Sequence, residues 1–181
     1  TGSSGADNVS AGDGDDTLSF GANLLAATDT IDAGAGDDTI AITADGTAVA
    51  TLVTNAETMN LATTVDATSA DLTGSGITSV TGAGTTVSNE TIAFANVAQT
   101  GVTIDLGAGT ADTVTLGNAA NNVTVTNVET ITGGSGNDTI TATTATVIIT
   151  GGGNDNLTGS SADDTFTRGT GGVQATDTLI G

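Results

Sequence analysis

The segment Gly133-Gly134-Ser135-Gly136-Asn137-Asp138-Thr139-Ile140-Thr141 joins a glycine-rich turn to a short stretch rich in β-branched residues. Its second half, an acidic residue followed by threonine and an apolar residue, returns throughout the chain. The aspartate copies are Asp16-Thr17-Leu18, Asp29-Thr30-Ile31, Asp38-Thr39-Ile40, Asp112-Thr113-Val114, Asp164-Thr165-Phe166 and Asp177-Thr178-Leu179, and the glutamate copies are Glu57-Thr58-Met59, Glu90-Thr91-Ile92 and Glu129-Thr130-Ile131. Proline is absent, so every backbone N–H is free to pair between strands. The sequence therefore predicts repeated turns and short β-strands.

The nine residues from Gly133 fit the pattern G-G-x-G-x-D-x-U-x, in which U is a large apolar residue. This pattern resembles the calcium-binding repeat of RTX proteins. The resemblance implies that six residues of each repeat form a turn and three form a strand, and that two repeats complete one coil. Two further pairs of copies lie nine residues apart, Asp7 with Asp16 and Asp155 with Asp164. We therefore expect an all-β chain, a parallel β-roll or β-helix solenoid with calcium bound in its turns.

The spacing between Asp138 and Asp155 is 17 residues, one short of two nonapeptides. The half-coil between them, around Thr144–Val147, has neither the glycines nor the aspartate of the motif. We interpret it as a coil with one calcium-binding edge and one dry edge. Alternation of β-branched residues, as in Val123-Thr124-Val125-Thr126, predicts strands with one buried face.

A longer repeat appears when the chain is shifted by 148 residues, which aligns Gly5–Ile31 with Gly153–Leu179 without a gap. We expect one continuous solenoid that is a unit of a longer tandem array. Its calcium-binding coils are predicted at residues 1–43 and 132–181, the second set truncated within a repeat, and Thr/Ala/Val-rich coils with fewer metal sites at 44–131. The one place where a turn of helix is compatible with the sequence is Asn23–Ala27.

The charge of the chain points in the same direction. Twenty-one acidic residues face one basic residue, Arg168, which gives a formal net charge of −20. Self-repulsion of this size opposes compaction, and divalent cations would relieve it. The same charge argues against nucleic acids and anionic membranes as partners, because both require cationic groups. Cysteine is absent, so calcium would take over the role of disulfides, and no apolar run approaches the length of a membrane span.

The resemblance to RTX repeats implies the calcium ligands residue by residue. The side-chain ligands are Asp7, Asp16, Asp38, Asp138, Asp155 and Asp164, and the carbonyl donors are Gly5, Gly14, Gly36, Gly134, Gly136, Gly151 and Gly153. Glycine tolerates positive φ, so successive carbonyls can turn toward one point. Because Ca²⁺ takes six to eight oxygens, one loop fills about half of a shell and the loop one coil away fills the rest. We expect Asp138 and Asp155 to form such a stacked pair.

Other acidic residues have weaker motifs. We expect Asp29 and Asp177 to be solvated turn acids, because no glycine precedes them at the required offset, and Asp15, Asp37 and Asp163 to add only field strength. Glu57, Glu90 and Glu129 are expected to cap turns at strand edges, with Asn55-x-Glu57 and Asn127-x-Glu129 as alternative metal-binding pairs. An extra residue between glycine and aspartate weakens the motif at Asp105 and Asp112.

The function that this pattern favours is that of a calcium-dependent extracellular structural protein, secreted or at the bacterial cell surface. In composition the chain resembles surface-layer proteins and RTX adhesins, which implies type I secretion, folding outside the cell and self-assembly into a layer, matrix or filament. Its partners would be copies of itself and possible surface polysaccharide, with neither nucleic acid nor membrane insertion. Ligands assembled by folding couple binding to folding, so we expect the calcium-free chain to be largely disordered.

Two alternatives come from other classes. An adhesin or ligand-binding module for carbohydrate or ice would use flat threonine faces such as Thr141-Ala142-Thr143-Thr144, although a regular T-x-T ladder is present in the sequence only as scattered pieces. A polysaccharide-degrading enzyme on a parallel β-helix is disfavoured, because the chain lacks His, Lys, Trp and Tyr and so lacks the usual bases and sugar-stacking platforms. We expect no catalytic activity.

Overall fold

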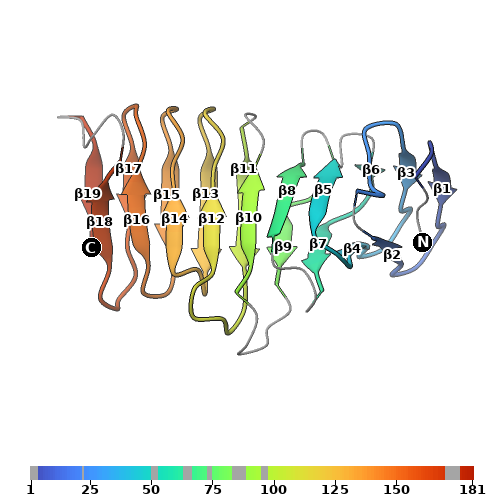
Figure 1. Ribbon diagram of the computed structural model, residues 1–181, viewed down its shortest axis with the longest axis horizontal. Coiled ribbons are helices and arrows are strands. Elements are labelled where there is room, and N and C mark those ends of the chain that lie inside the picture. The colour runs from blue at the N-terminus through green and yellow to red at the C-terminus, as the bar shows by residue number, and fades with distance from the viewer. Residues whose placement is uncertain are drawn as a thin grey trace.

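The computed structural model describes residues 4–21, 23–49, 53–62, 67–72, 75–82, 89–94, 98–169 and 176–181. Within these ranges every regular element is a β-strand, and the strands stand side by side along the long axis of the molecule (Figure 1). No helix in the described ranges has the length and apolarity to cross a membrane. All strand pairs are parallel, which confirms the predicted parallel β-solenoid.

The strands form three sheets whose members are separated in sequence by the other sides of the coil. The nine-stranded sheet contains β2 (Thr17–Phe20), β4 (Thr39–Ile42), β7 (Thr58–Leu61), β9 (Ser79–Thr81), β11 (Thr100–Asp105), β13 (Asn122–Thr126), β15 (Thr139–Ala142), β17 (Asn156–Thr158) and β19 (Thr178–Ile180). The seven-stranded sheet contains β5 (Gly46–Val49), β8 (Ala67–Asp71), β10 (Thr91–Phe94), β12 (Thr113–Thr115), β14 (Thr130–Thr132), β16 (Val147–Thr150) and β18 (Thr165–Arg168), and the three-stranded sheet contains β1 (Asn8–Ser10), β3 (Thr30–Asp32) and β6 (Val53–Thr54).

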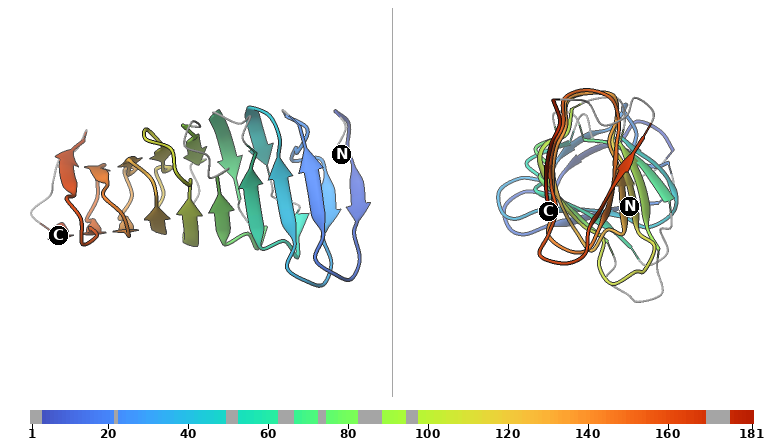
Figure 2. Two further views of the ribbon diagram at one scale, coloured as in Figure 1. Left: turned by 90° about the horizontal axis from the view of Figure 1, so that it is seen from below. Right: turned by 90° about the vertical axis from the view of Figure 1, so that its left-hand side faces the viewer.

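Coil length changes along the solenoid. In the C-terminal half the chain alternates between the two large sheets. Equivalent residues from Asn121 through Asp138 to Asp155 are 17 positions apart, as the sequence predicts for Asp138 and Asp155, whereas Asp155 and Asp177 are 22 apart. Near the N-terminus the chain visits three sheets, and Asp16 pairs with Asp38, 22 positions later. The prediction that nine residues make half a coil is therefore wrong at this end, where they make one of three sides. Viewed along the axis, the coils stack on one another (Figure 2).

The acid-Thr-apolar triplet corresponds to one repeated local structure. The acid ends the turn, the threonine faces outward and the apolar residue points into the coil. On the seven-stranded sheet the inward residues Ile92, Val114, Ile131 and Ile148 are buried and lie directly above one another. Each coil packs only on its neighbours, as in other solenoids, so small and medium-sized apolar side chains fill the narrow interior.

The outward threonines form rows that the sequence does not reveal. On the nine-stranded sheet the strand register aligns Thr17, Thr39, Thr58, Ser79, Thr103, Thr124, Thr141 and Thr158. Residues about one coil apart thus become neighbours at the strand spacing of about 4.8 Å. The second outward position of the same strands varies, with Ala41, Asn60 and Asp105 among its residues, so a regular T-x-T ladder is still not formed.

The 148-residue repeat is visible in strand pairing. Asn8 pairs with Thr30 between β1 and β3, and Asn156 pairs with Thr178 between β17 and β19, so the same two positions meet at both ends of the described chain. The turn of helix considered for 23–27 is not formed. Instead Asn23 adopts a φ of 56° and Leu24 N–H donates to the Gly21 carbonyl in a tight turn.

Candidate metal centres in the turns

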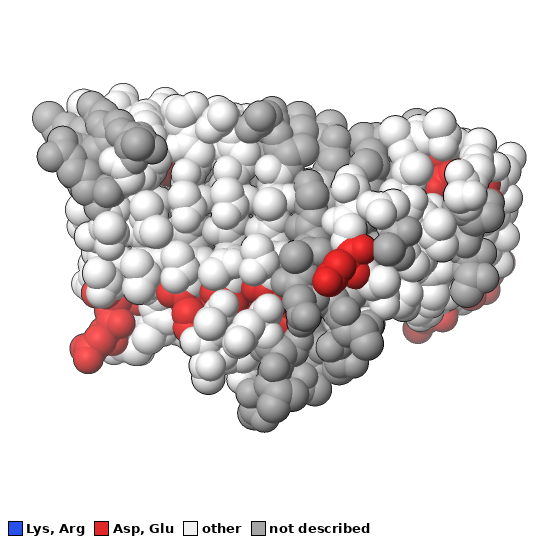
Figure 3. Space-filling model, in the orientation of Figure 1, with Lys and Arg blue, Asp and Glu red and all other residues white. Residues whose placement is uncertain are grey.

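The residues that immediately precede the strands form two rows along the solenoid. The long turn row precedes the nine-stranded sheet and consists of Asp16, Asp38, Glu57, Thr78, Gln99, Asn121, Asp138, Asp155 and Asp177. The short turn row precedes the seven-stranded sheet and includes Asp45, Glu90, Asp112, Glu129, Thr146 and Asp164. Acidic side chains gather in a line along one edge of the C-terminal coils (Figure 3).

Most of the acids in these rows join two coils through a hydrogen bond. Asp138 N–H donates to Asp155 Oδ1 at 3.0 Å, and Asp155 N–H donates to Asp177 Oδ1 at 2.9 Å. At the N-terminal end, Asp16 N–H donates to Asp38 Oδ1 at 2.7 Å. A carboxylate of one coil thus accepts from the backbone of the equivalent residue one coil earlier. This arrangement satisfies a backbone donor that the strand ladder does not reach.

The same arrangement leaves charge buried between the coils. Asp138 is 1% exposed and Asp155 is 3% exposed. Asp38 Oδ2 and Asp138 Oδ2 are buried and accept no hydrogen bond. Burial raises the pKa of the Asp138 carboxyl, and hydrogen bonds from the side chain and backbone of Asn121 to Oδ1 offset this in part. Burial also raises the pKa of Asp155, and the charges of Asp138 and Asp177 raise it further against the hydrogen bond from Asp138. Such oxygens require a proton or a cation.

Glycine is required at these turn positions for two different physical reasons. Gly14 and Gly153 adopt φ values of 115° and 104°, which side chains rarely tolerate. At Gly134 and Gly151 the reason is close approach, since a Cβ on either would collide with the carbonyl of Gly117 or Gly134 in the preceding coil. Turn carbonyls therefore lie directly against the next coil.

Oxygen atoms suited to a hard cation thus meet in these turns. Among the described residues no three His, Cys, Asp or Glu side chains converge to hold an ion, so a site here must combine one or two carboxylates with backbone carbonyls. Ca²⁺ accepts this mixture at six to eight ligands. The unpartnered Oδ2 atoms of Asp38 and Asp138, in turns whose carbonyls approach the adjacent coil closely, fit calcium.

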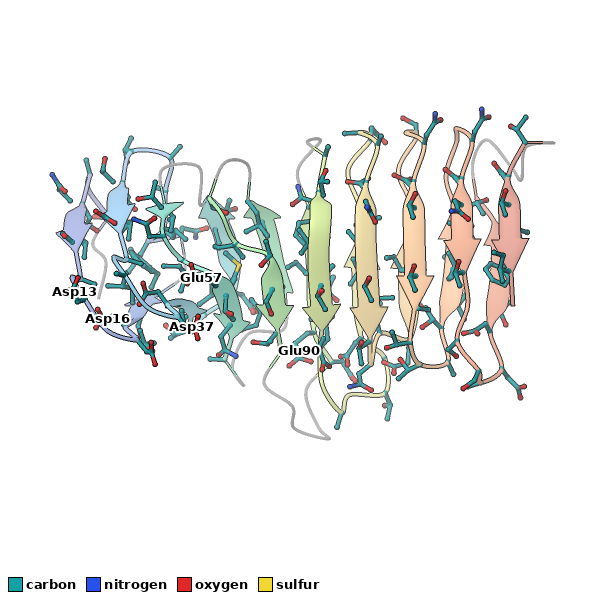
Figure 4. All side chains as sticks on the ribbon, turned by 180° about the vertical axis from the view of Figure 1, so that it is seen from behind. Asp13, Asp16, Asp37, Glu57 and Glu90 are labelled. Carbon is teal, nitrogen blue, oxygen red and sulfur yellow. The ribbon has the colours of Figure 1, made fainter. Side chains whose placement is uncertain are left out.

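The structure brings the predicted ligands together in two groups. Asp138 and Asp155 are stacked and buried, with Gly134, Gly136, Gly151 and Gly153 in the turns before them. Asp16 and Asp38 are stacked in the same way, with Gly14 and Gly36 in their turns, and Figure 4 shows Asp13, Asp16 and Asp37 around these turns. Gly5 and Asp7 lie in the turn before β1, where Asp7 N–H donates to Asp29 Oδ1 at 3.0 Å.

Asp164 lies apart from the other predicted ligands, in the short turn row. Its Oδ1 accepts from Thr146 N–H at 3.0 Å and its Oδ2 from Ser160 N–H at 2.6 Å. Both oxygens therefore have donors from the protein. Thr146 belongs to the half-coil that the sequence predicts to be dry, so the equivalent position one coil earlier has no carboxylate.

Several acids behave differently from their sequence-based description. Asp29 is buried, not solvated, and its Oδ2 accepts from Ala26 N–H at 2.8 Å. The expectation for Asp15 is also incomplete, because its carboxylate accepts from Asp37 N–H at 3.0 Å and links two turns. The capping role of Glu57 and Glu129 is confirmed, since they accept from Asp38 N–H and Asp112 N–H at 2.8 and 2.7 Å.

The two Asn-x-Glu motifs share a structure that explains their asparagines. Asn55 and Asn127 adopt φ values of 58° and 50°, a left-handed conformation that asparagine tolerates better than most residues. Their amides donate to the side chains of Asp32 and Asp105, at 2.8 and 2.9 Å. The asparagines thus allow the turn conformation, and their amide N–H groups stabilise the negative charge of an aspartate carboxylate.

Gly12 and Gly34 are turn residues that were not among the predicted calcium ligands. Both have φ values above 110°, and a Cβ on Gly34 would collide with the Gly12 carbonyl of the preceding coil. A signal was available in the sequence, because each stands two positions before a predicted donor, in Gly12-Asp13-Gly14 and Gly34-Ala35-Gly36.

Comparison with known proteins identifies the repeats. The model of the RTX calcium-binding nonapeptide repeat matches four segments, residues 1–23, 26–41, 126–144 and 142–172. These segments contain the two groups of stacked aspartates and leave the middle of the chain unmatched. No curated protein and no solved structure matches the chain. RTX repeats bind Ca²⁺ in several turns of a β-roll and are typically structural parts of secreted proteins.

Proposed function

Because this chain is an RTX repeat protein with calcium-binding nonapeptides toward both ends, we propose that it is an extracellular structural protein that calcium folds after secretion. The observation that carries the proposal is the buried, unpartnered Oδ2 of Asp138, in a turn stacked on that of Asp155. An ion bound there would neutralise both carboxylates and hold the two coils together.

Calcium would act as the positive partner that the chain lacks. With a formal charge of −20, stacking of the coils brings like charges together in the turn rows. In the proposed sites Asp138 and Asp155, and likewise Asp16 and Asp38, supply carboxylate oxygens, and the turn glycines supply carbonyl oxygens. Since the ligands come from different coils, they meet only in the folded chain, and the free energy of binding adds to that of folding.

The solenoid also supports a proposal of self-assembly into a layer, matrix or filament. The nine-stranded sheet extends from β2 to β19, and its outer face carries mainly small polar residues. A repeating rod of this kind can pack laterally on copies of itself when calcium has removed most of its charge. The proposed partner is therefore a second copy of the same chain, at the cell surface or in the surrounding matrix.

The test uses the chain after transfer from excess chelator into millimolar calcium. We expect several bound ions per chain by equilibrium dialysis, and ordered layers or filaments by electron microscopy. Magnesium is the matched control, because it demands octahedral geometry and keeps its waters, and it should support neither. An absence of bound calcium contradicts the proposal, and monodisperse monomers at high concentration contradict its assembly step.

A second candidate function has one observation in its favour. The aligned row from Thr17 to Thr158 gives the nine-stranded sheet a face of regularly spaced hydroxyl groups. Such a face could bind ordered water at an ice surface or a polysaccharide, as in a ligand-binding or adhesin module. Thermal hysteresis of the calcium-loaded chain tests ice binding, and Thr124→Val and Thr141→Val should lower it. Equal freezing behaviour with and without the protein contradicts this candidate.

A further inference from the structure

Asn121 occupies the position in its coil that Asp138 occupies in the next one. Its backbone N–H donates to Asp138 Oδ1 at 2.9 Å, 17 residues later in the chain. The turns before them are stacked as well, because a Cβ on Gly134 or Gly136 would collide with the carbonyl of Gly117 or Ala119. Turn 117–121 is therefore the structural equivalent of turn 134–138, although the sequence gives it neither the aspartate nor the second glycine.

The side-chain amide of Asn121 lies where oxygen atoms from two coils meet. Its Nδ2 donates to the Ala119 carbonyl at 2.8 Å, to the Gly117 carbonyl at 3.1 Å and to Asp138 Oδ1 at 2.8 Å. Its Oδ1 accepts from Gln99 N–H at 3.0 Å. Only one orientation of the amide fits these contacts, because Oδ1 must face the single donor while the two N–H groups of Nδ2 are shared among three acceptors. The side chain is 3% exposed and fully engaged.

The oxygens around this nitrogen match those of the proposed calcium sites. Gly117 and Ala119 are the equivalents of Gly134 and Gly136, the carbonyl donors of the next turn, and Asp138 is the carboxylate one coil further along. In turn 134–138 the corresponding side chain is a carboxylate whose Oδ2 is buried without a partner. The two turns thus present similar oxygen atoms. In turn 117–121 the Asn121 amide already contacts them, whereas turn 134–138 contains a buried carboxylate oxygen without a positive partner.

We propose that the Asn121 amide takes the place of a calcium ion between the turns of β13 and β15. Its N–H groups, which carry partial positive charge, gather two carbonyls and one carboxylate as a cation would. This inference rests on the proposed function, because it assumes that the equivalent oxygens of turn 134–138 ligate calcium. The turns of the two adjacent coils that contain β13 and β15 are then held together without a metal ion. This junction separates the calcium-binding coils that follow from the metal-poor coils before it and offers them a preformed coil on which to fold.

The direct test is Asn121→Asp, which replaces the amide with a carboxylate. We expect the variant to bind one more Ca²⁺ per chain than the parent by equilibrium dialysis, and to require a several-fold higher calcium concentration for half-maximal β signal in circular dichroism. Asn118→Asp is the matched control. It adds the same charge in the same turn at an exposed position and should leave both quantities unchanged.

The reverse exchange at Asp138 protects the test against a variant that fails to fold. Asp138→Asn should bind one ion fewer than the parent yet keep its C-terminal coils at low calcium, because the new amide can contact Gly134 and Gly136 as Asn121 contacts Gly117 and Ala119. Asp138→Ala should lose both the ion and those coils. Equal behaviour of the two variants, or no added ion in Asn121→Asp, overturns the inference. A parent chain that binds no calcium instead overturns the proposed function.

Discussion

Asp155 accepts a hydrogen bond of 3.0 Å through Oδ1 from the backbone N–H of Asp138, one coil earlier in the solenoid. The relationship repeats between Asp16 and Asp38 and between Asp155 and Asp177. The acids that make the chain so negative are therefore also the groups that join its coils. The chain needs them at these positions and needs a counter-charge beside them.

Replacement of Asp155 by alanine should destabilise the C-terminal coils even in saturating calcium. The change leaves the buried N–H of Asp138 without an acceptor, which costs about 1–3 kcal/mol, and it removes a proposed ligand. Urea unfolding followed by circular dichroism measures the loss. Asp163→Ala, at an exposed position, is the control and should change stability by less than about 0.5 kcal/mol. Equal effects of the two substitutions would show that the buried carboxylate has no special role.

Gly151 and Gly152 form a matched pair for testing coil stacking. A Cβ on Gly151 would collide with the backbone carbonyl of Gly134, whereas a Cβ on Gly152 meets Ser135 at an ordinary 3.8 Å. We expect Gly151→Ala to lower the thermal midpoint in calcium by several degrees and Gly152→Ala to leave it nearly unchanged. If Gly151→Ala is tolerated as well as Gly152→Ala, the stacking of turn carbonyls described for these coils is incorrect.

Asp112 makes the middle of the solenoid sensitive to pH. The side chain is 0% exposed. Its pKa is raised to about 6, chiefly by burial. A backbone hydrogen bond from Glu90 lowers this pKa, whereas a side-chain hydrogen bond with Glu90 and the charges of Glu90 and Glu129 contribute to the rise. Because this pKa exceeds that of the unfolded chain, ionised Asp112 destabilises the folded state above about pH 6. The penalty should fall as the pH drops from 7 toward 4, and no further gain should follow below the unfolded pKa.

The measurement for Asp112 is thermal unfolding of the parent and of Asp112→Asn as a function of pH. The variant should be more stable than the parent at pH 7, because an amide replaces a buried charge and can still accept from Glu90 N–H. The two proteins should converge near pH 4. A constant difference across this range would contradict the assignment of the pH dependence to Asp112.

Stacked apolar residues should carry most of the remaining stability. Ile131 is fully buried between Val114 and Ile148 of the adjacent coils. Ile131→Ala should cost about 2–5 kcal/mol, the usual range for deleting a buried isoleucine side chain. The outward Thr130 is the control, since Thr130→Ala removes no core packing. Urea midpoints in saturating calcium compare the two, and similar shifts would contradict the inward orientation of Ile131.

The parts of the fold that local sequence determines were predictable. The triplet specifies its own strand, because its threonine faces outward and the apolar residue that follows faces inward. The 17-residue spacing gives the length of the coil between Asp138 and Asp155. Asp16, Asp38, Asp138 and Asp155 could likewise be found from their glycine frames, and the stacking of Asp138 on Asp155 from their spacing, whereas the pairing of Asp16 with Asp38 could not. These features depend on residues that are close in sequence or repeat a recognisable pattern.

The remaining features depend on which coils come to lie side by side. The third side of the N-terminal coils, formed by β1, β3 and β6, could not be recognised, because its triplet Asp29-Thr30-Ile31 resembles those of the two larger sheets. The threonine row and the burial of Asp29 follow from that register. Asn121 was missed for a different reason, because its turn lacks the aspartate that marks the motif, and only the stacked carbonyls of Gly117 and Ala119 reveal its role.

The central claim is that cations permit the stacking of these acidic coils, and circular dichroism of the chain in excess chelator and in millimolar calcium tests it most directly. The account predicts a largely disordered spectrum in chelator and a β spectrum that grows with calcium to saturation. The same β spectrum in both solutions would contradict it.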